Sequence, residues 1–110
     1  MRTVSQLFNE DLPAALTENA EDAKSIGAKF QFNILGEGEW HLDLTKTGAT
    51  CVPGNQKADC TVSISNKDFQ TLLENPEKNA MSMYFTGKLK VAGNQMLGLK
   101  LKQILGYLPR

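Results

Sequence analysis

The sequence predicts an α+β domain, in which helices cover one face of a five-stranded, mostly antiparallel sheet. Three observations lead to this fold class. The chain has 110 residues, enough for one hydrophobic core. Apolar residues recur at helical spacing, then alternate with polar ones in four segments, and return to helical spacing around a fifth short segment. This order of elements is typical of the α+β class, and we expect a single domain over residues 1–110.

The first twenty-odd residues are predicted to form an amphipathic helix, because apolar residues recur on one side and acidic residues lie on the other. Pro13 interrupts the pattern, and Asp11 is a fair N-cap for a new start. We therefore expect a short helix, a kink near residues 11–13, and a second helical piece that ends by Gly27.

Four strands follow, because the apolar period changes to two. Residues 28–34 and 40–44 alternate on either side of a Gly-Glu-Gly turn and predict a hairpin with one buried face. A turn at 46–48 leads into a strand over 49–52, and a Pro-Gly-Asn turn separates it from a strand over 60–64. We expect these four strands to be in meander order and antiparallel.

Two helices, a strand and a last helix complete the prediction. A helix capped by Ser65 or Asn66 ends before Pro76, because the residue preceding a proline resists helical geometry. That proline suits the first turn of the next helix, which runs to the following glycine. Residues 88–91 predict a short fifth strand with its charges on one face, and residues 95–106 predict the final helix.

Composition and charge exclude several classes of protein. Twelve basic and twelve acidic residues give a formal net charge of zero, so no overall field attracts nucleic acid. The balance is uneven, with a net charge of −4 over residues 1–55 and +4 over residues 56–110. The sequence has neither the apolar run of a signal peptide nor 18 consecutive apolar residues. We expect a cytoplasmic protein that does not bind nucleic acid.

Few residues suit catalysis or metal binding. His41 lies two residues from Asp43 on the expected exposed face of a strand, but no nucleophile accompanies this pair. Cys51 and Cys60 lack CxxC spacing, so we expect reduced, semi-buried strand residues, the alternative being a disulfide or a reactive thiol. Zinc, calcium-loop and nucleotide-binding motifs are absent. We predict a binding protein without catalytic residues, metal or cofactor.

The second half of the chain carries more apolar residues than a helix packed on a sheet requires. On the last helix, one stripe is suited to docking on the sheet, whereas Met96 lies off that stripe and Leu99 points roughly opposite. Lys100 and Lys102 flank this apolar surface, a pattern compatible with the surface of an anionic bilayer. The surplus predicts either a functional apolar site or contacts within the core or an oligomer.

The segment Gly87-Lys88-Leu89-Lys90-Val91-Ala92-Gly93-Asn94, followed by Met96-Leu97-x-Leu99-Lys100-Leu101, resembles the closing signature of the sterol carrier protein 2 (SCP2) family. Further matches in order and spacing are Phe30-Gln31-Phe32, Trp40, Lys57 to Thr61, and Met83 to Phe85. The resemblance covers roughly residues 3–105. The chain lacks the peroxisomal tripeptide of many eukaryotic members, which indicates a free-standing prokaryotic-type member.

The resemblance implies a hydrophobic tunnel between the sheet and the helices, with a fatty acid, a fatty acyl-CoA or a sterol-like lipid inside and no catalytic residue. Carried over by position, the lining residues are Phe32, Trp40, Phe69, Leu73, Met81, Phe85, Met96, Leu97, Leu99 and Leu101. Some members carry an amide where Lys102 stands, so the polar end of the cavity differs here and sterol is the least secure ligand.

These observations predict a non-catalytic intracellular lipid carrier that is a monomer or a weak dimer. Four lysines are expected either to contact a headgroup or an anionic membrane, or to form an ordinary solvated face: Lys88, Lys90, Lys100 and Lys102. One alternative is an accessory scaffold that presents a lipid-like substrate to partner enzymes. Another, less favoured, is a small acyl-CoA hydrolase that uses Asp43 or Asp59.

Overall fold

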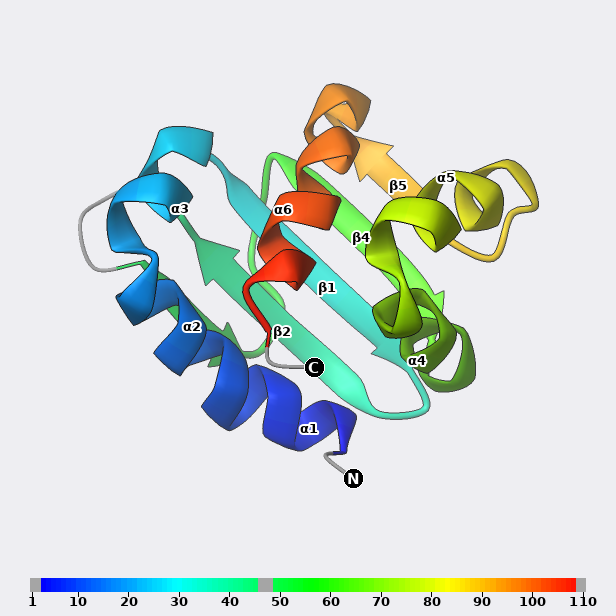
Figure 1. Cartoon of the computed structure of the whole chain (residues 1–110), viewed down its shortest axis with the longest axis horizontal. Coiled ribbons are helices and arrows are strands. Elements are labelled where there is room, and N and C mark those ends of the chain that lie inside the picture. The colour runs from blue at the N-terminus through cyan, green and yellow to red at the C-terminus, as the bar shows by residue number, and fades with distance from the viewer. Residues whose placement is uncertain (1–2, 46–48, 109–110) are drawn as a thin grey trace.

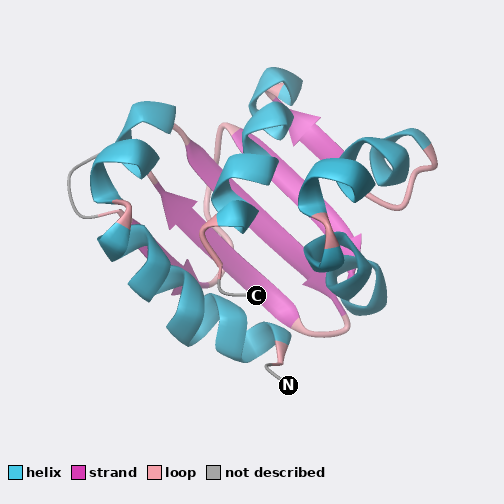
Figure 2. Cartoon of the chain, in the orientation of Figure 1, coloured by secondary structure: helices cyan, strands magenta, loops and turns pink. Residues whose placement is uncertain are grey.

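The computed structural model describes residues 3–45 and 49–108. It confirms the α+β class: a five-stranded sheet forms one layer, and the described helices form a second layer on one of its faces (Figure 1). Figure 2 shows the same two layers by secondary structure. None of the helices in the described part of the chain is long and apolar enough to cross a bilayer.

The sheet has the strand order β3-β2-β1-β4-β5. Its strands are β1 (Lys29–Leu35), β2 (Gly38–Asp43), β3 (Thr50–Pro53), β4 (Cys60–Ser65) and β5 (Lys90–Gly93). The first three form the expected antiparallel meander. The expectation is wrong for β4, which pairs in parallel with β1, while β5 pairs with β4 in antiparallel fashion. The sheet is therefore mixed, with one parallel pair among three antiparallel ones.

The connection from β3 to β4 explains the parallel pair, because it carries the chain from one edge of the sheet across to the far side of β1. Gln31 holds this connection: its Nε2 donates to the Gly54 carbonyl at 3.0 Å, and its Oε1 accepts from the Gln56 amide at 3.1 Å. His41 Nδ1 lies 3.3 Å from the same Oε1, and the side chain is only 4% exposed. The expectation of an exposed His41 is therefore wrong.

The N-terminal helical region consists of α1 (Val4–Gln6), a π-helical segment over Leu7–Asp11, α2 (Leu12–Glu18) and α3 (Ala20–Ile26). Thr3 caps the start, in a capping box with Gln6. Asp11, the predicted N-cap of the second piece, precedes α2 but makes no side-chain capping hydrogen bond there. The chain changes to π-type hydrogen bonds just before Pro13, and the break between helices lies at Asn19 instead of at 11–13. The predicted end at Gly27 is confirmed, with a φ of 63°.

Pro13 accounts for the local geometry of this region. In the π-helical pattern the Leu12 amide donates to the Leu7 carbonyl, five residues back. The next carbonyl, that of Phe8, would accept from residue 13, but proline has no N–H to donate. The Cys51 thiol donates to this carbonyl instead, at 3.2 Å. The proline therefore frees an acceptor that links the helix to β3.

The remaining elements are α4 (Asn66–Glu74), α5 (Pro76–Phe85), a 3-10 helix η2 (Gln95–Lys100) and α6 (Leu101–Gly106). Ser65 Oγ accepts from the Asp68 amide at 3.1 Å, which confirms one of the two predicted caps. The fifth strand begins two residues later than predicted. The amides of Lys88 and Leu89 donate to the Met83 carbonyl, at 2.9 and 3.0 Å, so these residues belong to the turn that follows α5.

The core lies between the sheet and the N-terminal helices, and aromatic rings fill it. Phe8 stacks on Trp40 at a centroid distance of 4.6 Å and on Phe69 at 5.4 Å, and its ring tilts against that of Phe32 at 5.4 Å. Trp40 Nε1 donates to Asn9 Oδ1 at 2.9 Å, so the one polar atom of the indole is satisfied. We call this cluster of four rings the aromatic core.

Candidate functional site

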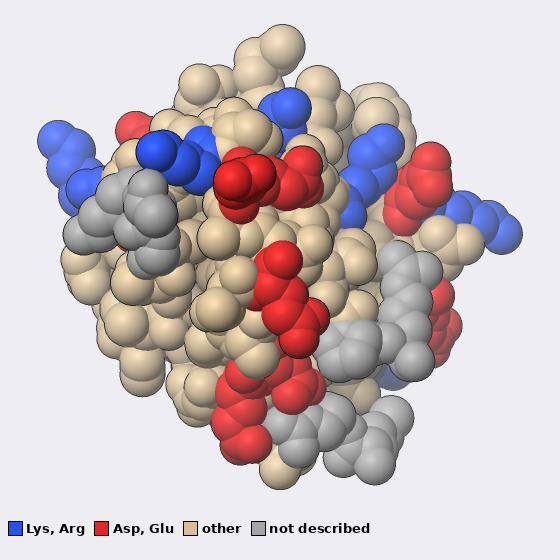
Figure 3. Space-filling model, turned by 60° about the vertical axis from the view of Figure 1, so that its left-hand side comes forward, with Lys and Arg blue, Asp and Glu red and all other residues tan. Residues whose placement is uncertain are grey.

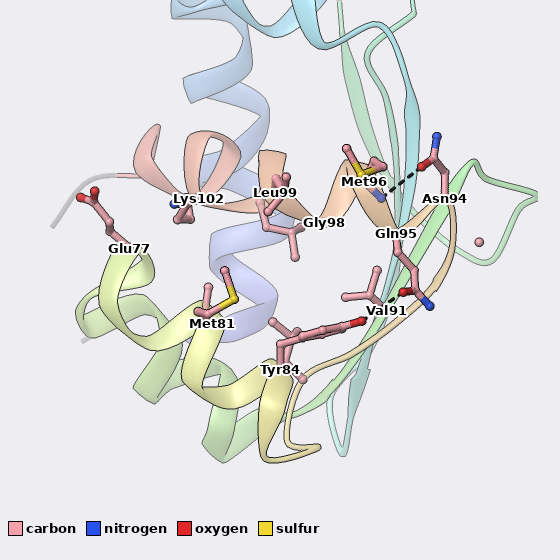
Figure 4. Close-up of a pocket in the computed structure, with 14 residues that line it drawn as sticks. Glu77, Met81, Tyr84, Val91, Asn94, Gln95, Met96, Gly98, Leu99 and Lys102 are labelled. Atoms are coloured by element: carbon pink, nitrogen blue, oxygen red, sulfur yellow. Dashed lines mark hydrogen bonds between the residues drawn. The ribbon is translucent and has the colours of Figure 1, made fainter.

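A pocket of about 460 Å³ lies between α5, the η2–α6 segment and the edge strand β5 (Figure 4). This volume is in the range of sites that hold small molecules. The fourteen lining residues are Glu77, Ala80, Met81, Tyr84, Leu89, Val91, Gly93, Asn94, Gln95, Met96, Gly98, Leu99, Leu101 and Lys102.

The α5 wall follows from the cap and the spacing of that helix. Asn75 Oδ1 accepts from the Lys78 amide at 3.1 Å, which fixes where the helix begins, and Pro76 occupies its first turn. Four lining residues of this helix are spaced i, i+3, i+4 and i+7, so they share one face. They are Glu77, Ala80, Met81 and Tyr84.

The opposite wall depends on a sharp turn after β5. Gly93 has a φ of 82°, and a Cβ atom there would lie 2.6 Å from the Asp59 carbonyl oxygen, so only glycine fits. The Asn94 amide donates to that same carbonyl at 2.8 Å, and Asn94 Oδ1 accepts from the Met96 amide at 3.1 Å. The turn folds η2 back over the edge of the sheet, where none of its residues is buried.

The lining is apolar in the middle and polar at two ends. At one end the Tyr84 hydroxyl donates to Gln95 Oε1 at 3.1 Å, close to Asn94 (Figure 4). At the other end lie Glu77 and Lys102, and the structure gives neither side chain an ion pair with another described residue. The pocket therefore suits an apolar chain with a polar group near one end.

None of the fourteen lining residues is Ser, Cys or His, so the lining holds no Ser–His or Cys–His pair of the kind used in nucleophilic catalysis. Cys51 and Cys60 are free thiols outside it, and burial raises the pKa of Cys51 to about 12 and that of Cys60 to about 11. Asp59 Oδ2 accepts from the Lys29 amide at 3.0 Å, and Asp43 Oδ1 from the Thr45 amide at 2.9 Å. Both carboxylates thus accept hydrogen bonds from backbone amides, and neither residue lines the pocket.

The structure brings five of the predicted site residues together at this pocket: Met81, Met96, Leu99, Leu101 and Lys102. The two that fall outside the sheet-docking stripe are exposed, Met96 by 72% and Leu99 by 54%.

The other predicted site residues lie elsewhere, and their role in lipid binding stays a prediction. Phe32, Trp40 and Phe69 belong to the aromatic core, where Phe8 packs against them. Two more, Leu73 and Leu97, are half-buried beside the core. Exposed positions outside the lining are Phe85, Lys88, Lys90 and Lys100.

The prediction did not include several lining residues, although the sequence contains a signal for some of them. The spacing of Glu77, Ala80 and Tyr84 around Met81 is that of a helix face, but two of these residues are polar and hide the pattern. The contribution of Gln95 depends on the turn at residues 93–94, which no local periodicity reveals.

The two ends of the molecule carry opposite charge. Residues 3–26, which form α1 to α3, hold five acidic side chains and one basic, a net charge of −4. Acidic groups form a band on the face that brings α2 and α3 forward (Figure 3). Residues 88–108, on the pocket side, hold four lysines and no acidic residue. The uneven charge of the sequence thus becomes a separation in space.

Comparisons with known proteins agree with this architecture. The model of the SCP-2 sterol transfer family matches residues 8–106. Sterol carrier protein 2 of Rattus norvegicus is 31% identical over 107 residues, which covers 91% of this chain and 19% of the relative. Hydroxysteroid dehydrogenase-like protein 2 of Xenopus laevis is 37% identical over 94 residues, covering 82% and 22%. The chain thus spans about a fifth of the length of these relatives.

A solved structure is similar over most of its length. The apo form of sterol carrier protein 2 from Yarrowia lipolytica superimposes with a TM-score of 0.71 and 31% identity. The match covers 94% of this chain and 84% of that one.

Proposed function

This chain belongs to the SCP-2 sterol transfer family, and we propose that it is a non-catalytic carrier that holds the apolar chain of a fatty acid or a similar lipid in the pocket between α5, η2 and α6. Family membership supports a lipid-binding or sterol-carrier role. The observation that carries the proposal is an apolar pocket whose wall includes Met81, Met96 and Leu99, each about half exposed or more.

The free energy of burying an acyl chain is sufficient for useful affinity. Each buried methylene contributes about 0.8 kcal/mol, so a sixteen-carbon chain gains up to roughly 10 kcal/mol. Immobilising the chain and ordering the wall remove about half of this or more. The remainder corresponds to an affinity on the order of micromolar. Methionine side chains adapt to chains of different shape, which suits such a wall.

We further propose that the pocket side makes transient contact with anionic membranes during lipid exchange. Lys88, Lys90 and Lys100 are exposed near the pocket, and Phe85, 76% exposed, lies three residues before Lys88. Each lysine contributes about 1 kcal/mol near an anionic surface. The acidic helices at the other end are repelled by the same surface, so the charge separation orients the molecule with its pocket toward the lipid.

The experiment that tests the carrier proposal is Leu99→Asp, measured by titration with a fluorescent fatty acid. A carboxylate in the apolar wall is expected to lower affinity at least tenfold, because the chain would have to desolvate it. The matched control is Leu35→Asp, since Leu35 is 63% exposed and lies outside the pocket lining. Both variants should keep the circular dichroism spectrum of the wild type. Unchanged affinity in Leu99→Asp would count against the proposal.

A second candidate is an accessory scaffold that presents a lipid-like substrate to partner enzymes from the same pocket. The observation in its favour is the exposure of two large apolar side chains, Phe85 and Met96, which suits a protein surface as well as a membrane. Capture of one specific partner enzyme, lost in Phe85→Ala, would support the scaffold. An acyl-CoA hydrolase finds no support in the geometry, because Asp43 and Asp59 hold backbone amides.

A further inference from the structure

The two polar ends of the pocket differ in whether the protein itself supplies hydrogen-bond or ion-pair partners for their polar side chains. At one end, the Tyr84 hydroxyl donates to Gln95, and Asn94 Oδ1 accepts from the Met96 amide. At the other end, no described side chain forms an ion pair with Glu77 or Lys102. A ligand headgroup gains most where a charged group still lacks a partner, which is the end formed by Glu77 and Lys102 (Figure 4).

Of the lysines on the pocket side, only Lys102 lines the pocket within the described chain. Its neighbour Leu101 is 1% exposed, so packing fixes the backbone from which the Lys102 side chain extends. The walls beside it are apolar, with Met81 and Leu99 among them. Lys102 itself is exposed, so its ammonium group is accessible to an anionic headgroup at this end of the pocket.

Glu77 lies in the first turn of α5, where a carboxylate is stabilised by the positive end of the helix. An anionic headgroup that binds Lys102 is at the same time repelled by Glu77, so the two residues are expected to affect its affinity in opposite directions.

We propose that Lys102 makes this pocket selective for single-chain lipids with an anionic head, such as a fatty acid carboxylate, and sets the headgroup at the α5–α6 end. The inference rests on the proposed function, since it assumes that the pocket holds an acyl chain. A neutral lipid of the same length forms no ion pair with Lys102, whereas the carboxylate of a fatty acid forms one.

The test compares dodecanoate with 1-dodecanol, which share a chain length and differ in charge, by isothermal titration calorimetry at pH 8. The wild type is expected to bind dodecanoate several-fold more tightly. Lys102→Met keeps an unbranched apolar side chain of similar length and removes the charge, so it should lower dodecanoate affinity several-fold and leave 1-dodecanol affinity unchanged. Glu77→Gln should raise dodecanoate affinity a few-fold.

Lys78→Met is the matched control, because Lys78 lies beside Glu77 on the same helix but does not line the pocket. It should change neither affinity. If the wild type binds both ligands equally and Lys102→Met changes nothing, the selectivity is overturned while the carrier proposal stands. If the wild type binds neither ligand, both fail. A loss of 1-dodecanol binding equal to that of dodecanoate in Lys102→Met would also overturn the inference, because it would show a role in shape and not in charge.

Discussion

The helical layer has two halves that cover the same face of one sheet in different ways. Over β1 and β2, α1 and α2 close the space with Phe8, which stacks against Trp40 and Phe69. Over β5, α5 and η2 leave a pocket of about 460 Å³, and η2 buries none of its residues. The comparison teaches that the packed core and the proposed ligand pocket lie in separate halves, so a change in one can leave the other intact.

Helix α6 stands between the halves and belongs to both. Ile104 and Leu105 are buried against the core, whereas Lys102 faces the pocket. At its C-terminal end Gln103 Nε2 donates to Asp22 Oδ2 at 2.8 Å, and the Tyr107 hydroxyl donates to the same oxygen. These bonds lower the pKa of Asp22, and burial together with Asp22 raises the pKa of Tyr107 to about 12. The pocket thus has one wall anchored to α3 through α6.

Phe8→Ala is expected to produce the largest loss of stability, because it removes the central ring of the aromatic core. Removing a buried phenylalanine typically costs about 3–5 kcal/mol of unfolding free energy, and this ring contacts three other aromatic rings. Urea denaturation measures the loss. Dodecanoate affinity of the protein that remains folded should change less than threefold. A destabilisation under about 1 kcal/mol would show that the halves are not divided as described.

An intermediate loss of stability is expected at acid pH. It arises at His41, which lies on the face of the sheet opposite the helices. Burial lowers the pKa of His41 from its ordinary value of 6.5, and the smaller effect of Asp43 opposes this. The unfolded chain therefore takes up a proton at a higher pH than the folded protein does. Stability from this residue is complete above about pH 6.5 and is lost as the pH falls toward the lowered pKa.

His41→Gln removes the proton-binding group and should flatten the pH dependence of the urea midpoint between pH 7.5 and 5. Pocket affinity for the neutral ligand 1-dodecanol should stay constant over the range in which the protein is folded. The same slope in wild type and variant would assign the acid sensitivity to other groups.

The sequence predicted the features that local periodicity encodes. Alternation predicts β1, β2 and β4, and helical spacing alone puts Met96 and Leu99 outside the sheet-docking stripe. The parallel pairing of β4 with β1 and the burial of His41 both depend on a crossover held by Gln31, a contact between residues far apart in sequence. Likewise, nothing local shows that Phe8 fills the space beside Phe32 and Trp40.

The smallest effect on stability, and the sharpest contrast with Phe8, is expected for Phe85→Ala. The same substitution is made at a ring that is 76% exposed, so the unfolding free energy should change by less than about 0.5 kcal/mol. Binding to vesicles with anionic lipid should nevertheless weaken several-fold, because the exposed ring precedes Lys88, one of the lysines proposed to contact such a surface, by three residues. Cosedimentation with the vesicles measures this, with Leu35→Ala as an exposed control away from the pocket. Equal losses of vesicle binding in the two variants would mean that the bilayer does not recognise the pocket side. A loss confined to Phe85→Ala would assign membrane contact to the half of the molecule that holds the pocket.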